Sequence, residues 1–100
     1  MIDLSNKVVL VSKRIIKDDG AEFFDTFFGT VKSYNENTVI LTKQTGHEVS
    51  IPNSEELYEV AEEGFYELND GSTYENPDLI AQFVVYQSNE AYEKFKGKNE

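Results

Sequence analysis

Short runs of apolar and β-branched residues, separated by polar residues, recur along the whole chain. The clearest run covers residues 47–51, where His47, Val49 and Ile51 alternate with Glu48 and Ser50. A period of two is typical of a β-strand that buries one face and exposes the other. Runs rich in β-branched and aromatic residues predict further strands at residues 7–16, 23–34, 38–43, 65–68 and 79–86.

Turn residues separate these runs at intervals of about eight to twelve positions, which is the spacing of a β-meander or a small barrel. The strongest turn signals are Asp18-Asp19-Gly20, Asp70-Gly71 and Asn76-Pro77-Asp78. Gly29, in the middle of a long run, predicts a bend or a bulge. We therefore expect a mainly β fold, a small antiparallel barrel or meander of about five or six strands.

Two helical segments are expected, and both are short. Asn53, with Glu56 three residues later, has the pattern of a helix N-terminus and predicts one or two turns. Ser88 is a candidate cap for a short C-terminal helix, whose apolar face would carry Ala91, Tyr92 and Phe95, with Gly97 beyond its end.

The 100 residues are expected to form a single domain, because no linker, repeat or low-complexity segment divides them. No run approaches the roughly 20 apolar residues of a membrane-spanning helix. The first residues lack the basic and apolar regions of a signal peptide, and cysteine is absent. We therefore expect a protein of the reducing cytoplasm that has no membrane partner.

The charge of the chain is unevenly distributed. The net charge is −10, and residues 44–93 contain twelve acidic residues but no Lys or Arg. Such a stretch either keeps the protein soluble or forms an acidic surface that attracts a basic partner. Direct binding to nucleic acid is disfavoured in both cases, because phosphate contacts need clustered Lys and Arg.

Candidate catalytic and metal-binding residues are few. With no cysteine and one histidine, the chain lacks the usual ligands of zinc, and His47 is expected to be a partly buried, hydrogen-bonded residue of a strand. No carboxylate pair stands out as the acid and base of a hydrolase. Asp18-Asp19-Gly20, with Glu22 and Asp25, lacks the spacing of a calcium loop and predicts a turn. We expect no enzyme activity, no metal and no cofactor.

Four phenylalanines, Phe23, Phe24, Phe27 and Phe28, fall on both faces of one predicted strand. Such rings either pack into a core or form a stacking platform for nucleic-acid bases. Core packing is favoured, because Asp25 lies between the two pairs and no Lys or Arg is adjacent.

The region from Gly29 to Tyr86 resembles a known family. Its features are Gly29 in a strand, Pro52 at the end of another strand, the motif Gly64-Phe65-Tyr66-Glu67-Leu68, and the turn Asn76-Pro77-Asp78. They are similar to the small β-barrel immunity proteins that bacteria encode beside secreted polymorphic toxins, including those of contact-dependent growth inhibition. The resemblance implies an SH3-like barrel in the cytoplasm that binds and neutralises a cognate toxin, here a basic, nuclease-type one.

An acidic surface suits this function, because it could cover the basic groove of a nuclease and accelerate the encounter. The alternative is an acidic SH3-like adaptor domain that has no toxin partner. In either case the candidate partner-binding residues lie in the acidic loop and the hairpin after it, with Tyr58 and Tyr74 as aromatic anchors. The full set is Glu55, Glu56, Tyr58, Glu59, Glu62, Glu63, Tyr74, Glu75 and Asp78. The sequence leaves the toxin's identity, the mode of inhibition and the oligomeric state open.

Overall fold

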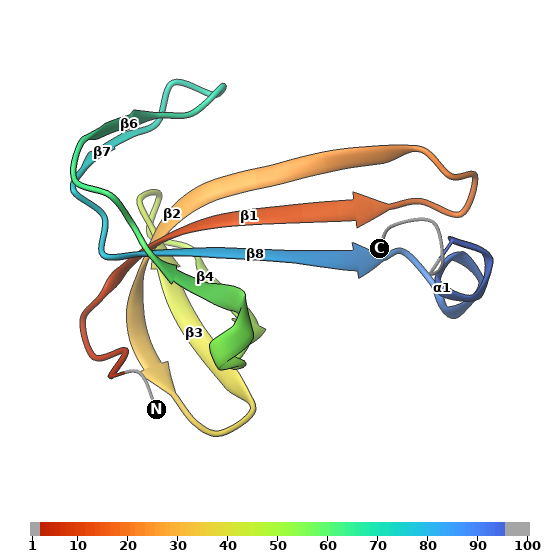
Figure 1. Cartoon of the computed structure of the whole chain (residues 1–100), viewed down its shortest axis with the longest axis horizontal. Coiled ribbons are helices and arrows are strands. Elements are labelled where there is room, and N and C mark those ends of the chain that lie inside the picture. The colour runs from red at the N-terminus through yellow and green to blue at the C-terminus, as the bar shows by residue number, and fades with distance from the viewer. Residues whose placement is uncertain (1–2, 96–100) are drawn as a thin grey trace.

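The computed structural model, which describes residues 3–95, is mainly β with one short C-terminal helix, as the sequence predicts (Figure 1). The described residues form eight strands, β1 Val8–Ile16, β2 Glu22–Tyr34, β3 Thr38–Lys43, β4 Glu48–Pro52, β5 Tyr58–Val60, β6 Phe65–Glu67, β7 Thr73–Glu75 and β8 Leu79–Tyr86. A 3₁₀ turn, η1 Glu55–Leu57, precedes β5, and the helix α1 Asn89–Phe95 follows β8.

Six of the strands form one sheet in the order β4-β3-β2-β1-β8-β5, and β6 and β7 form a separate hairpin. The sequence predicts an antiparallel sheet, whereas the observed sheet contains one parallel pair, β1 and β8. A parallel pair needs a long connection, and here all the intervening elements supply it. The sheet curls, but β4 and β5 at its two edges do not pair with each other. The expected barrel therefore stays open in the part of the chain that the structure describes.

Hydrogen bonds at both ends fix the register of the parallel pair. The N–H of Val8 donates to Oδ2 of Asp78 over 2.8 Å, and the N–H of Asp78 donates to the carbonyl of Val8 over 2.9 Å. At the far end, the N–H of Gln87 donates to the carbonyl of Ile16 over 2.8 Å. Asp78 thus acts in the fold itself, by satisfying the backbone where β1 begins.

The hydrophobic core lies inside the curled half of the sheet. Val9 and Val11 of β1 and Ala81 of β8 are completely buried, and so are Val39 and Leu41 of β3. Alternate residues of β1 and β3 thus point to the same interior, which is the pattern that a period of two predicts. Phe27 and Tyr58 close this core from β2 and β5.

Beyond the curled half, β1, β2 and β8 continue as an extended three-stranded projection, which we call the arm (Figure 1). It consists of residues 12–16, 22–26 and 82–86. Strand β3 pairs with β2 only from Gly29 onward, and β5 pairs with β8 only up to Ala81. In the described chain, therefore, both outer strands of the arm have one edge without a neighbouring strand.

Helix α1 lies at the end of the arm, where β8 stops (Figure 1). Ala91 is completely buried, and its N–H donates to Oγ of Ser88 over 3.2 Å, so the predicted cap is confirmed. Tyr92 contacts Tyr86 edge-on, with 5.1 Å between the ring centroids. The side chain of Phe95 and all of Gly97 lie outside the described residues. No helix in residues 3–95 has the length and apolar character needed to cross a membrane.

Three local expectations are wrong. The 3₁₀ turn begins after Ser54, and Asn53, the expected cap, instead donates its side-chain amide to the carbonyl of Asn35. His47 is exposed in the turn before β4 and not on the inner face of that strand. The irregularity of β2 falls between Val31 and Ser33 rather than at Gly29.

Gly29 is needed for a different reason, the close approach of β2 to β3. A Cβ atom at this position would lie 2.9 Å from Cβ of Leu41, which is fully buried and too close to the backbone to swing away. Gly29→Ala is therefore expected to lower the free energy of unfolding by about 1–3 kcal/mol, the usual cost of overpacking. Urea unfolding measures this, with Ser33→Ala at an exposed position of the same strand as the control. Equal stability of both variants would contradict the close approach.

Candidate partner-binding surface

The β6–β7 hairpin contacts the main sheet through Tyr74. Tyr66 and Tyr74 are opposite each other in the hairpin, so both point to the same face. The ring of Tyr74 lies against Phe28 of β2, with 5.7 Å between centroids, and Tyr66 donates its hydroxyl hydrogen to the carbonyl of Glu62 over 2.8 Å. The other face of the hairpin, which carries Phe65, is consequently turned outward.

Phe65 is the most exposed aromatic side chain of the described residues, at 69%. Its neighbours on the outward face are Glu67 and Glu75, which are both exposed, and Glu75 is directly opposite it in β7. An apolar ring surrounded by carboxylates resembles the centre of many protein interfaces, where one anchor is ringed by polar groups. Phe65 is not among the partner-binding residues predicted from the sequence, although alternation with Tyr66 indicates that the two rings point to opposite faces.

Several hydrogen bonds hold the hairpin in place. Gly64 and Asn76 bond at its base, where the N–H of Asn76 donates to the carbonyl of Gly64 over 2.8 Å and the N–H of Gly64 to Oδ1 of Asn76 over 2.7 Å. Nε2 of Gln44 donates to the carbonyl of Thr73 over 2.9 Å, which links β7 to the turn between β3 and β4. At the tip, hydrogen bonds from the hydroxyl and the backbone N–H of Ser72 lower the pKa of Asp70, so this carboxylate stays charged in mild acid.

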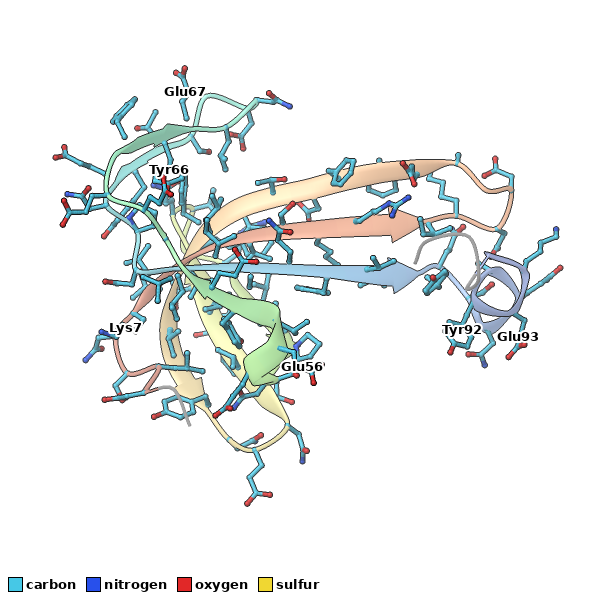
Figure 2. All side chains as sticks on the ribbon, viewed as in Figure 1. Lys7, Glu56, Tyr66, Glu67, Tyr92 and Glu93 are labelled. Carbon is cyan, nitrogen blue, oxygen red and sulfur yellow. The ribbon has the colours of Figure 1, made fainter. Side chains whose placement is uncertain are left out.

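The predicted acidic residues separate into two groups. Glu62 and Glu63 precede Gly64 and so lie beside Glu75 at the base of the hairpin. Glu55, Glu56 and Glu59 belong to η1 and β5, and Figure 2 shows Glu56 well away from Tyr66 and Glu67, with β8 between them. All six are exposed, but they do not form one continuous patch.

Both predicted aromatic anchors have contacts inside the fold. Tyr58 is only 8% exposed, belongs to the core, and donates its hydroxyl hydrogen to the carbonyl of Pro52 over 3.3 Å. Tyr74 is half-buried against Phe28. Tyr58 is therefore corrected from a partner anchor to a core residue, because a side chain used inside the fold cannot also enter a partner's pocket. The sequence pattern does not separate these cases, since a buried and an exposed tyrosine look alike.

The four phenylalanines of β2 divide in the same way. Phe27 and Phe28 are 8% and 2% exposed and pack on opposite faces of the sheet, as the preference for core packing predicts. Phe23 and Phe24, on the arm, are 44% and 62% exposed. The ammonium of Lys17 lies 5.2 Å from the ring centroid of Phe23, whereas Phe24 remains open to solvent.

Of the residues considered for calcium binding, Asp18, Asp19 and Gly20 form a turn, whereas Glu22 and Asp25 belong to β2. Gly20 has φ of 89° in the turn between β1 and β2, and the N–H of Ala21 donates to Oδ1 of Asp19 over 2.9 Å. The turn predicted for Asp18-Asp19-Gly20 is thereby confirmed. No group of three or more His, Cys, Asp or Glu residues within residues 3–95 is placed to hold a metal ion.

No family model, no curated protein and no solved structure matches this chain.

The burial of Tyr58 has a consequence for stability at high pH. Desolvation raises the pKa of its hydroxyl above the ordinary value of 10.0, because the charged form is disfavoured in the core. The resulting stabilisation is complete below pH 10.0 and is lost as the pH rises through the raised value in the folded state. We expect the free energy of unfolding to fall less steeply above pH 10.0 in Tyr58→Phe than in the parent, because the variant has no hydroxyl at this position to ionise.

Urea unfolding at a series of pH values measures this slope. At neutral pH Tyr58→Phe should lose up to about 1.5 kcal/mol with its hydrogen bond. Tyr34→Phe is the control, because Tyr34 lies at the surface and bonds to Asp3. Its slope should follow that of the parent. Identical slopes for Tyr58→Phe and the parent would show that Tyr58 is accessible to solvent.

Proposed function

We propose that this chain is an immunity protein, which binds and neutralises a cognate, basic, nuclease-type bacterial toxin by covering its active site or substrate surface. The observation that carries the proposal is Phe65, an exposed aromatic side chain on a hairpin whose outward face also carries Glu67 and Glu75, with Thr73 as its fourth residue. Such an arrangement suits a partner that offers an apolar pocket rimmed by Lys and Arg.

Two physical effects support this function. Burial of an aromatic ring in a desolvated pocket provides much of the affinity of a protein interface. The surrounding carboxylates act mainly on the association rate, because opposite charges steer the encounter of two proteins before they touch. A toxin that attracts nucleic-acid phosphates presents the positive charge that such an acidic surface attracts.

Neutralisation in cells tests the proposal directly. The C-terminal domain of the secreted protein encoded in the neighbouring reading frame is expressed in a sensitive bacterium, with and without this chain. We expect growth only when both are present, and a stable one-to-one complex in pull-downs. Growth arrest in both cases, or a neighbouring gene that encodes no such protein, would contradict the proposal. Weak binding to several unrelated ligands would identify an adaptor instead.

Phe65→Ala should weaken the complex by roughly 30-fold or more, because the interface loses its anchor. Stability should be nearly unchanged, since the side chain is exposed in the free protein. Calorimetry against the purified toxin domain measures the affinity, with Glu36→Gln at the exposed turn between β2 and β3 as the control. Tight binding by Phe65→Ala would place the interface elsewhere.

Two variants that lose the same number of charges, one from each of the two groups of acidic residues, can be compared. The triple change Glu62→Gln, Glu63→Gln and Glu75→Gln removes three charges beside Phe65, and the change of Glu55, Glu56 and Glu59 to Gln removes three from η1 and β5. We expect association at low salt to slow by about tenfold in the first variant and much less in the second. Stopped-flow kinetics at two salt concentrations measures both. Equal rates would mean that only net charge matters.

A further inference from the structure

The arm presents a sheet edge that no strand of the described chain covers. Strand β2 pairs with β1 over residues 22–30, but its pairing with β3 begins only at Gly29. Residues 22–28 of β2 therefore have a neighbouring strand on one side only, and on the other side residues 25–28 line a hollow with Gln44 and Thr45 of the turn after β3. An edge of this length presents a row of backbone donors and acceptors onto which another strand can add.

The hydrogen-bond pattern identifies which backbone groups face outward. The N–H of Val31 donates to the carbonyl of Lys7, and the N–H of Lys17 donates to the carbonyl of Ala21. The antiparallel register is unbroken between these two bonds. Along such a strand, the backbone N–H and C=O groups of successive residues point alternately to one side and the other. The odd-numbered residues of β2 thus turn toward β1, and Glu22, Phe24 and Thr26 direct their N–H and C=O groups to the open edge.

A groove runs beside this edge. It has a volume of about 360 Å³ and lies between residues 24–26 of β2 and residues 67–70 at the tip of the β6–β7 hairpin. A second hollow of about 330 Å³ continues from Phe24 along the same face of the arm, past Ser12, Arg14, Gln82 and Val84. Phe24 lines both, which makes its exposed ring the natural contact for a side chain in the groove.

Charge selects the occupant. The first groove is lined by three acidic residues, Asp25, Glu67 and Asp70, and a single Lys43 lines the adjoining hollow that shares Asp25 and Asp70, so the carboxylates are in excess. The nearest guanidinium along the arm, that of Arg14, already forms an ion pair with Glu22. A second copy of this chain, with a net charge of −10, would bring the same carboxylates against themselves. A segment rich in Lys or Arg would neutralise them.

We infer that the open edge of β2 is a docking site at which an extended, Lys- or Arg-rich segment of a partner protein adds as a further strand. Its backbone pairs with Phe24 and Thr26, and side chains on one face enter the groove between Phe24 and the hairpin tip. That the partner is a toxin rests on the proposed function, whereas strand addition by a basic segment does not.

Two capped synthetic peptides of equal length, one alternating Lys with Val and the other alternating Glu with Val, test the inference against the isotope-labelled full chain. With the Lys peptide we expect saturable NMR shifts along residues 22–28. Hydrogen exchange should slow at least tenfold at the amides of Phe24 and Thr26, and little at Asp25, which already faces β1. No slowing at the edge, equal binding of the Glu peptide, or self-association of the chain without peptide would overturn the inference.

Phe24→Ala should weaken binding of the Lys peptide about tenfold, as expected for the loss of an aromatic contact. Phe23→Ala is the matched control, since it removes the same ring from the opposite face of the same strand and should leave binding unchanged. Thr26→Pro removes one outward N–H without touching the pairing with β1, and should also abolish protection. If that variant does not fold, the difference in Lys-peptide affinity between Phe24→Ala and Phe23→Ala still tests the inference.

The two proposals can fail separately. Toxin neutralisation without any binding of the Lys peptide would refute strand addition and leave the immunity function standing. Peptide binding that depends on Phe24, together with failure to protect cells, would refute the immunity function and leave the docking site.

Discussion

The parallel pairing of β1 with β8 is the constraint on which the rest of the structure depends. It places β1 in the centre of the sheet, where Val9 and Val11 are completely buried. It also requires that the chain, which leaves β1 at Ile16, cross to the opposite end of the sheet and enter β8 at Leu79, beside Val9. The hydrogen bonds between Val8 and Asp78 join the first residue of β1 to the residue before β8. They also hold the base of the β6–β7 hairpin close to the main sheet.

The lengths of the strands beside β2 explain why this one strand has two environments. The duplicated Phe-Phe motif of β2 is buried at Phe27 and Phe28, where the curled sheet covers one face and Tyr74 the other. Phe23 and Phe24 are exposed, because this first part of β2 extends beyond the end of β3. Identical side chains four residues apart thus either stabilise the core or remain accessible. The difference lies in the lengths of the neighbouring strands, not in the motif.

Local structure could be predicted from the sequence wherever the signal is local. The bounds of β3 and β8, the Asp70-Gly71 turn and the Ser88 cap all depend on residues a few positions apart. The parallel pair joins residues about seventy positions apart, and alternation within each strand says nothing about its partner. The candidate site has the same limit. The acidic stretch is visible in the sequence, but the burial of Tyr58 and the exposure of Phe65 depend on which face each element turns to the core.

The long connection between β1 and β8 also bears on how the protein is made. During synthesis β1 and β2 can form their hairpin early, because their contacts are close in sequence. The central strand then keeps one bare edge until residues 79–86 have left the ribosome, so the sheet cannot be completed before β8 has emerged. The nascent hairpin, with its row of Val, Ile and Phe side chains, is in that interval the species most exposed to aggregation or to capture by a chaperone.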